Sequence, residues 1–380
     1  MSNPILLAPG PVQLHPEVQK ILAQPMIHHR TPEFDQILAR ALKNLKFLFQ
    51  TTNPVFMHTS TGSGGMESVL VNVLSAGDEV LAIVSGKFGE RWADMAETYH
   101  AKVHRLNVEW GKAVQVSDVQ NFLQKNPQIK IVLCQACETS TATSHDIQAL
   151  GKIIANTPAL FLVDGITATG AYDVQMDAWH IDGLIAGSQK AVMLPTGLSF
   201  VSLSEKAWRK AETATTPRFY FDLRKELKAN KNGETLFSSP VPLIKALDYV
   251  LSRIQELGLH KHFKHLKRRA DFTREIGKAM GLGILSSSPS DSVTALTLPE
   301  GLNGVKFREE VEKKYAVTVM GGQEQLKGKI IRIGHMGYIL DEHMVETMYR
   351  LAMCLKDFGQ NIDPEKIKSL SLAWLKANLT

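Results

Sequence analysis

Cysteine is scarce in this sequence, and long apolar runs are absent from it. Only 3 of the 380 residues are cysteine, too few for the disulfide framework that stabilises small secreted proteins. No apolar run approaches the ~18 residues that a membrane span requires, and the first residues show neither the basic segment nor the apolar stretch of a signal peptide. We therefore expect a cytoplasmic protein without a membrane partner.

The excess of positive charge is also small. Lys and Arg number 43 against 38 Asp and Glu, which gives a net charge of +5. The most basic stretch, residues 260–269, carries apolar residues at helical spacing, which favours a solvated helix face over a nucleic-acid patch. Cys134 and Cys137 have the spacing of a zinc or redox pair, but they follow a buried-strand pattern and no second pair exists. We expect no metal site and no nucleic-acid partner.

Short apolar runs alternate with helical patterns between about residues 55 and 205. The runs predict strands at 55–58, 79–84, 102–106, 130–135, 160–164, 183–187 and 199–202. Helical patterns lie between several of these runs, at 64–74, 88–99, 116–124 and 146–154. This order predicts an α/β fold with a mostly parallel sheet that is covered on both faces. Such sheets bind ligands at the carboxyl ends of their strands.

A second, smaller α+β domain is predicted to begin near residue 260. Helical patterns at 242–257 and onward to residue 278 precede predicted strands at 294–298, 316–320 and 329–333, with helices at 305–314 and 343–356. The proline-rich start favours an extended segment over a helix. We therefore divide the chain into an N-terminal arm (1–15), a large α/β domain (16–259) and a small C-terminal domain (260–380).

The first candidate site is a glycine-rich loop at residues 59–67, between a predicted strand and a predicted helix. Glycines allow backbone N–H groups to approach an anion closely, and the start of a helix adds partial positive charge, so the loop predicts a phosphate site. A dinucleotide fingerprint would require glycine where Glu67 stands, and a nucleotide P-loop would require a lysine after the glycines. Taken alone, the loop is also compatible with a simple tight turn.

The second candidate site combines two strand ends. The apolar strand at 160–164 ends in Asp164. The next predicted strand, at 183–187, is followed by Lys190, twenty-six residues after Asp164. Adjacent parallel strands would bring both side chains to one sheet edge. These two residues alone fit a structural ion pair equally well. Together with the glycine loop they fit pyridoxal phosphate, with Lys190 as the Schiff-base lysine and Asp164 protonating the pyridine nitrogen.

The segment 161–169, together with 188–190 and 195–197, resembles the class V aminotransferases. Within that family it is most similar to alanine–glyoxylate and serine–pyruvate or serine–glyoxylate aminotransferases. Further matching segments lie at 6–11, 29–34, 61–64 and 328–334, so the resemblance covers nearly the whole chain. It implies the fold of type I pyridoxal-phosphate enzymes, with a seven-stranded sheet in the large domain, and a homodimer whose sites form at the subunit interface.

The resemblance also implies roles for individual residues. Lys190 and Asp164 would be catalytic, and Arg332 would bind the substrate carboxylate as a bidentate fork. The implied cofactor-binding residues are Thr61, Gly62, Ser63, Phe88, Thr139, Asp164, Ile166, Gln189 and Lys190. Plainer alternatives remain for three of these positions: Phe88 as a core residue, Thr139 as a loop hydroxyl, and Arg332 as a surface residue that closes a strand.

One stretch departs from the family pattern. In alanine–glyoxylate enzymes a Tyr and a Thr before the long helix reach the phosphate of the neighbouring subunit. Phe237 lacks that phenol here and Pro240 lacks that hydroxyl, although Ser238 or Ser239 would be able to replace them. The cross-subunit contact is therefore in doubt.

The predicted reaction is a transamination from serine or alanine to glyoxylate or pyruvate. A phosphonate or ureidoglycine transaminase is the alternative within the family. A cysteine desulfurase would need a mobile thiolate, whereas Cys354 lies in an amphipathic helical pattern and is expected to be buried. A non-catalytic regulator would have lost Lys190 or Asp164, and the missing third glycine argues against a nicotinamide oxidoreductase.

Overall fold

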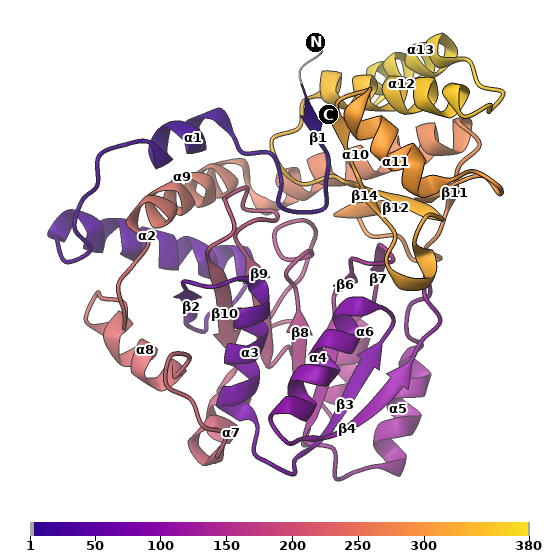
Figure 1. The fold of residues 1–380 in the computed structure, drawn as a ribbon. Coiled ribbons are helices and arrows are strands. Elements are labelled where there is room, and N and C mark those ends of the chain that lie inside the picture. The colour runs from indigo at the N-terminus through magenta and orange to yellow at the C-terminus, as the bar shows by residue number, and fades with distance from the viewer. Residues whose placement is uncertain (1–3, 379–380) are drawn as a thin grey trace.

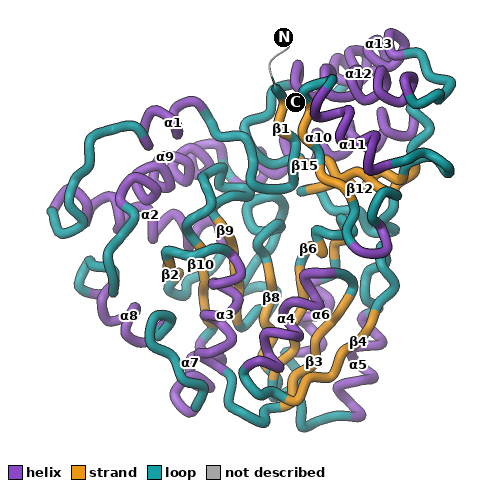
Figure 2. The backbone as a smooth tube through the Cα atoms, viewed as in Figure 1, coloured by secondary structure: helices purple, strands orange, loops and turns teal. Residues whose placement is uncertain are grey.

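The computed structural model describes residues 4–378, which form a large α/β part and a smaller α+β part at one edge of its sheet (Figure 1). Residues 1–3 of the predicted arm and residues 379–380 of the predicted small domain lie outside the described residues. Figure 2 shows helices on both sides of the large sheet.

The large part is built on a seven-stranded sheet with the strand order β2-β10-β9-β8-β5-β3-β4. Strand β10 runs antiparallel to both neighbours, and the other four neighbouring pairs are parallel. The predicted mostly parallel, seven-stranded sheet is confirmed. Its strands are β2 (Val55–His58), β10 (Ser199–Leu203), β9 (Gly183–Gly187), β8 (Leu160–Asp164), β5 (Ile131–Gln135), β3 (Glu79–Val84) and β4 (Lys102–Asn107).

Both faces of this sheet are buried, which explains why its strands are continuously apolar rather than alternating. In β5, Ile131 and Leu133 pack on one face, whereas Val132 and Cys134 pack on the other. The first face is covered by α3 (Gly62–Val73), α4 (Lys87–Thr98) and α7 (Glu205–Thr213). The second face is covered by α2 (Pro32–Phe49), α5 (Val116–Lys125), α6 (Ile147–Ile154) and α9 (Val241–Leu257).

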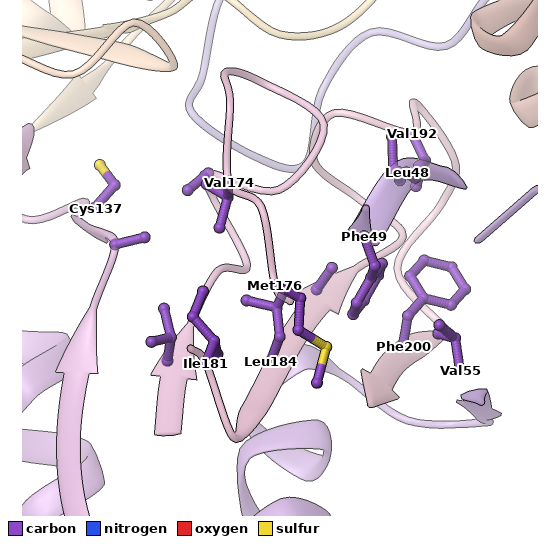
Figure 3. Close-up of a cluster of buried hydrophobic side chains, with 14 of the residues drawn as sticks. Leu48, Phe49, Val55, Cys137, Val174, Met176, Ile181, Leu184, Val192 and Phe200 are labelled. Carbon is purple, nitrogen blue, oxygen red and sulfur yellow. The ribbon is translucent and has the colours of Figure 1, made fainter. Parts of the chain in front are cut away.

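The core of the second face joins helix α2 to the sheet. Figure 3 shows Leu48 and Phe49 from α2 together with Val55, Leu184 and Phe200 from the strands. Helix α2 was not predicted, although Thr31 caps it with a hydrogen bond from the Phe34 N–H (3.4 Å) and Pro32 opens its first turn. Helices α1 (Pro16–Leu22), α7, α8 (Leu223–Lys231) and α13 (Pro364–Ala377) were also not predicted.

The smaller part has a four-stranded antiparallel sheet with its own apolar core. The strand order is β11 (Gly283–Ile284), β12 (Val293–Thr297), β15 (Ile330–Gly334) and β14 (Met320–Gly321). Helices α10 (Leu259–Ala279), α11 (Gly304–Lys313), α12 (Asp341–Asp357) and α13 contribute to its core, and η1 (Glu324–Leu326) is a short 3₁₀ helix.

The single strand predicted at 316–320 is wrong, because this segment divides between two sheets. Residues of β13 (Val317–Thr318) pair in parallel with β1 (Ile5–Leu6), whereas Met320 and Gly321 pair with β15. The N-terminal segment is thereby attached to the smaller part by backbone hydrogen bonds. It then passes over the carboxyl edge of the large sheet.

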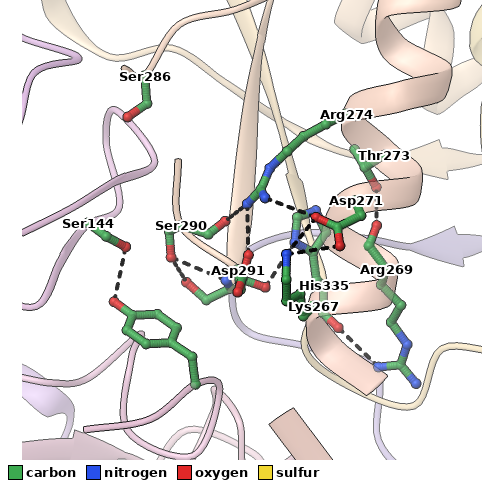
Figure 4. Close-up of polar contacts among 12 residues, drawn as sticks. Ser144, Lys267, Arg269, Asp271, Thr273, Arg274, Ser286, Ser290, Asp291 and His335 are labelled. Carbon is green, nitrogen blue, oxygen red and sulfur yellow. Dashed lines mark hydrogen bonds and ion pairs between the residues drawn. The ribbon is translucent and has the colours of Figure 1, made fainter. Parts of the chain in front are cut away.

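A polar junction joins the two parts near β6 (Cys137–Glu138) and β7 (Thr143–Ser144). The Ser144 N–H donates to the Ser288 carbonyl (2.8 Å), and the Ser290 N–H donates to the Ala142 carbonyl (3.0 Å). Figure 4 shows this region, where Arg274 of α10 bonds Asp291 (3.1 Å). These bonds fix the smaller part against the loop that carries Thr139.

The basic stretch of α10 is only partly the solvated face that its pattern predicts. Lys261, Lys264 and Lys267 are exposed, as predicted. His262, in contrast, is buried, and Arg269 donates hydrogen bonds to the carbonyls of His335, Gly337 and Ile339, so the prediction is wrong for these two. Within residues 4–378 no helix is both long and apolar enough to cross a bilayer. The same residues contain no group of three or more His, Cys, Asp or Glu side chains placed to hold a metal.

Candidate active site

Lys190 lies in the turn after β9 and is covered by the N-terminal segment. Its Nζ donates a hydrogen bond to the carbonyl of Pro9 (2.7 Å). Gly10 permits this approach, because a Cβ at that position would lie 2.6 Å from Nζ and its φ of +124° favours glycine. Burial lowers the pKa of Lys190 to about 8, although nearby Asp164 opposes this shift. An amine with a lowered pKa is more readily deprotonated and therefore more nucleophilic.

Asp164 is the last residue of β8, the strand that pairs in parallel with β9. Its Oδ1 accepts a hydrogen bond from the Ile166 N–H (2.9 Å). Burial raises the pKa of Asp164 to about 6, whereas the Ile166 hydrogen bond lowers it. No ion pair joins Asp164 to Lys190 or to any other described cation, so the simple structural ion pair left open by the sequence is not formed. A buried carboxylate without a cationic partner is suited to a cationic ligand.

The glycine loop forms the start of α3, as its sequence predicts. Thr61 is the N-cap residue and makes no side-chain capping bond, so the first N–H groups of α3 are not capped by it. Gly62 packs against Ile166, where a Cβ would lie 2.6 Å from Ile166 Cδ1. Arg91 donates a hydrogen bond to the Ser63 hydroxyl (3.2 Å). Free N–H groups beside a guanidinium are suited to a phosphate.

Arg91 is a residue for which sequence reasoning assigned no role. It lies one turn after Phe88 on α4, and its guanidinium stands 4.9 Å from the centre of the Phe88 ring. Phe88 itself is half-buried, so the alternative of a core residue is wrong. The spacing of three residues on a helix was the available signal, because such residues share a face.

Glu138 is a second residue that sequence reasoning missed. Its buried carboxylate accepts hydrogen bonds from the N–H groups of Phe88 (3.1 Å), Gly89 (3.0 Å) and Ser140 (3.1 Å), and from the Ser140 hydroxyl (2.5 Å). Burial raises the pKa of Glu138, while these hydrogen bonds lower it. Glu138 thereby joins the first turn of α4 to the loop that carries Thr139.

Thr139 and Arg332 meet where the two parts of the molecule touch. The Thr139 hydroxyl forms a hydrogen bond with the Thr167 hydroxyl (2.7 Å), and the Thr139 carbonyl accepts a hydrogen bond from Arg332 Nη1 (2.9 Å). Arg332 Nε donates to the Gly321 carbonyl (3.0 Å). Arg332 is only 7% exposed and is the third of the five residues of β15. The alternative of a surface residue that closes a strand is therefore wrong.

Arg332 has no carboxylate within ion-pair distance among residues 4–378. Burial lowers the pKa of Arg332, and nearby Glu138 opposes this shift without forming an ion pair. A guanidinium bound only to backbone carbonyls keeps its charge available for an anionic ligand. The Oε1 atom of Gln189 is buried and has no hydrogen-bond partner among residues 4–378, so it is free to accept a bond from a donor.

The model of the family described as aminotransferase class V matches residues 13–348. The chain belongs to the class V aminotransferase family. As a class V aminotransferase it is a pyridoxal-phosphate enzyme, and its large and small parts have the type I fold predicted from the sequence.

Several relatives are similar over almost the whole chain. A protein described as the small subunit of a soluble hydrogenase from Synechococcus sp. is 36% identical, covering 93% of this chain and 94% of that protein. L-aspartate–glyoxylate aminotransferase from Paracoccus denitrificans is 36% identical, with coverage of 94% and 92%. Serine–glyoxylate aminotransferase from Methylorubrum extorquens is 32% identical, with coverage of 98% and 96%.

A solved structure has the same fold. Ureidoglycine–glyoxylate aminotransferase from Bacillus subtilis superposes with a TM-score of 0.92 and 28% identity, and the match covers 99% of each chain.

The residues of this class V aminotransferase fit pyridoxal phosphate. The start of α3 with Arg91 suits its phosphate, and the unpaired Asp164 suits a protonated ring nitrogen. The low pKa of Lys190 suits its covalent attachment to the cofactor aldehyde. The fit therefore rests on three separate features of the site.

Cys354 does not meet the requirement of a desulfurase. It is fully buried in α12, as the sequence predicts, and burial raises the pKa of its thiol to about 12. Desulfuration needs an accessible thiolate, so this cysteine is unsuited to that reaction.

Proposed function

We propose that this aminotransferase transfers the amino group of a small amino acid, serine or alanine, to a small 2-oxo acid, glyoxylate or pyruvate. Glyoxylate appears in the names of three of the relatives described as aminotransferases, which supports it as the acceptor. Those names differ in the donor. The donor is therefore the part of the proposal that most needs a direct test.

The observation that carries the proposal is the state of Arg332. An amino acid and a 2-oxo acid share only their carboxylate, so a transaminase needs one carboxylate anchor for both. Arg332 is a buried guanidinium whose described partners are the backbone carbonyls of Thr139 and Gly321. A planar guanidinium bonds both oxygens of a carboxylate, whereas an ammonium acts as a point charge.

The other residues of the site divide the remaining work. Pyridoxal phosphate, when bound, supplies an electron sink for the carbanion at the substrate Cα. Lys190 Nζ would remove the Cα proton of the amino donor as a general base and, in the second half of the reaction, would deliver a proton to the Cα of the new amino acid. Asp164 would hold a proton on the ring nitrogen, and Phe88 would lie against the ring. Thr61, Gly62, Ser63 and Gln189 would bind the phosphate, Thr139 would reach the 3′-oxygen of the cofactor, and Ile166 would border the ring.

A donor panel tests this proposal. Serine, alanine, aspartate, ureidoglycine and 2-aminoethylphosphonate are each assayed with glyoxylate and with pyruvate, and the 2-oxo acid or aldehyde product is quantified. We expect the highest kcat/KM for serine or alanine with glyoxylate or pyruvate. A preference of tenfold or more for aspartate, ureidoglycine or the phosphonate would contradict the proposed donor, and no transamination of any donor would contradict the reaction.

We propose further that the enzyme is a cytoplasmic homodimer, divided as the sequence predicts into an arm (1–15), a large domain (16–259) and a small domain (260–380). Phe219 is 74% exposed, and the centre of its ring lies 6.1 Å from the centre of the Phe237 ring. The Phe237 ring in turn stacks on the Tyr220 ring, with 4.7 Å between their centres. An exposed aromatic cluster of this kind supports a subunit contact. Sedimentation of the purified enzyme tests it, and a monomer at micromolar concentration would contradict it.

The sequence leaves the cross-subunit phosphate contact open, with Ser238 and Ser239 as the two candidate hydroxyls. The Ser239 hydroxyl already bonds the Thr235 hydroxyl (2.5 Å), whereas Ser238 is exposed. We propose Ser238 as the residue that reaches the neighbouring subunit.

A further inference from the structure

A cavity of about 540 Å³ lies between the end of α9, the start of α10 and the segment 336–340, and neither Lys190 nor Asp164 lines it. His15, just before α1, closes one side. None of the residues assigned to cofactor or substrate lines this cavity. Its volume is that of a small-molecule site.

The walls of this cavity are largely apolar. Val250, Ile254, Leu266, Met336 and Ile339 line it, and each is at most 5% exposed. Tyr249 and Tyr338 add two aromatic rings, and His15 meets the Tyr338 ring edge-on at 4.7 Å. Such walls suit an apolar or aromatic body of a ligand.

The charge at the cavity is predominantly positive. Arg253 is exposed at its edge and forms no hydrogen bond or ion pair within residues 4–378. Burial lowers the pKa of neighbouring His15, and the charge of Arg253 lowers it further. Arg269 carries a second positive charge and bonds the carbonyls of the segment 335–339. Glu256 is the lining carboxylate, and it is not paired with Arg253. An apolar chamber with an unpaired guanidinium at its edge is complementary to an apolar carboxylate.

The cavity also touches the turn that carries the catalytic lysine. Ala191 and Met193 line it, and the Met193 N–H donates to the Lys190 carbonyl (3.0 Å). Met193 has a φ of +53°, an unfavourable backbone conformation for this residue. On the far wall, His262 Nε2 bonds the Gly170 carbonyl (2.8 Å), and a Cβ on Gly170 would lie 3.1 Å from Ala191 Cβ. The cavity is therefore the reverse side of the Lys190 turn.

We propose that this cavity is a second ligand site, which binds a monocarboxylate with an apolar or aromatic body. The carboxylate bonds Arg253 at the edge, and the body lies between Tyr249, Tyr338 and Met336, against the turn that follows Lys190. The proposal does not depend on which amino donor the enzyme uses.

Methyl NMR of the holoenzyme tests this site. The chain has 13 methionines, and ¹³C-methyl labelling gives each a signal. Met193 and Met336 line the cavity, whereas Met320 pairs with Arg332 and reports on the substrate site. The signals are assigned with Met193→Leu, Met336→Leu and Met320→Leu. The probe is 3-phenylpropionate, and its neutral amide serves as the matched probe without charge.

We expect 3-phenylpropionate to shift the Met193 and Met336 signals, and the amide to bind about tenfold more weakly. Arg253→Gln should weaken the carboxylate by a similar factor. Arg209→Gln is the matched control, since Arg209 is exposed on α7 and has no described partner, and it should leave binding unchanged.

Four results would overturn the proposal. The first is that millimolar probe leaves the Met193 and Met336 signals unchanged, which is expected if a second copy of the chain fills the cavity. The second is a shift of Met320 alone, which would place the probe at Arg332. The third is an amide that binds as tightly as the carboxylate, and the fourth is probe binding that Arg253→Gln does not weaken.

Discussion

Two buried carboxylates at the candidate site have opposite surroundings. Glu138 accepts hydrogen bonds from four described donors on two segments, whereas Asp164 accepts one, from the Ile166 N–H. Burial raises the pKa of both groups. A carboxylate that is fully hydrogen-bonded holds structure together, and one that is left almost bare is prepared for a charged ligand. The contrast distinguishes the residue that positions the site from the residue that acts in it.

The largest effect is expected at Lys190. Lys190→Ala removes the amine that attaches the cofactor and moves the Cα proton, so turnover should fall below detection and the visible cofactor band should disappear. Lys130→Ala is the control, since Lys130 is exposed at the start of β5 and should leave both unchanged. Retained turnover in the Lys190 variant would show that another group serves as the base.

Asp164→Asn tests the bare carboxylate. An amide does not hold a proton on the ring nitrogen, so the variant should bind the cofactor but lose about a hundredfold in kcat, on the order of 3 kcal/mol. Steady-state rates and the visible spectrum measure the two effects. If kcat stayed near that of the wild type, Asp164 would be a structural residue like Glu138.

The pH dependence of the apoprotein sharpens the same contrast. The pKa of Asp164 is raised from 3.8 to about 6, so its ionisation costs more in the folded chain than in the unfolded chain. Its contribution to stability is therefore present below pH ~4 and is lost as the pH rises through ~6, by up to about 3 kcal/mol. Urea unfolding between pH 4 and 7 should show this loss in wild-type apoprotein but not in Asp164→Asn. Parallel pH profiles for the two proteins would contradict the raised pKa.

Arg332→Lys replaces the planar fork with a point charge. We expect KM to rise for the amino donor and the oxo acceptor together, each by a factor that corresponds to roughly 2 kcal/mol of lost binding free energy. The cofactor spectrum should stay unchanged. Arg209→Lys is the control. An effect on one substrate alone, or a loss of cofactor binding, would show that Arg332 is not the shared anchor.

Glu138→Gln should have the smallest effect on chemistry and a measurable effect on stability. The amide accepts fewer of the four hydrogen bonds, which should cost about 1–2 kcal/mol of unfolding free energy. The first turn of α4 and the Thr139 loop should loosen, so cofactor affinity should fall a few-fold. Asp182→Asn is the control, because Asp182 is also buried and accepts from Phe161 N–H (2.9 Å) but lies at the opposite edge of the sheet.

If Asp182→Asn weakened the cofactor as much as Glu138→Gln did, the effect of Glu138 would be general destabilisation rather than positioning. Equilibrium dialysis of the cofactor against apoprotein, with thermal unfolding in parallel, separates these two outcomes.

The sheet was predictable because its strands are buried on both faces. Residues such as Val132 and Leu133 must both be apolar, so the runs at 131–135 and 160–164 are visible in the sequence, and the second run ends at Asp164 of the site. Helix α2 was missed although its start signals, Thr31 and Pro32, are present. The prediction of one strand at 316–320 is wrong because Ala316 has a φ of +52° and the residues after it pair with strands of two different sheets.

The site was predictable in its identities but not in its contacts. Asp164 and Lys190 follow from strand ends, because adjacent parallel strands share an edge. The bond from Lys190 Nζ to the Pro9 carbonyl joins residues 181 positions apart, and the Arg332–Thr139 bond spans 193 positions. Sequence periodicity carries no information on such pairs. Glu138 acquires its role through tertiary contacts of the same kind, which no local pattern shows, whereas the helical spacing of Arg91 from Phe88 was a local signal for its role.

The most direct test of the account is the position of the covalent cofactor bond. The holoenzyme is reduced with borohydride and digested, and mass spectrometry locates the pyridoxyl group. We expect the label on Lys190, the lysine in the turn after β9 whose pKa burial lowers to about 8. A pyridoxyl group on any other lysine would contradict it.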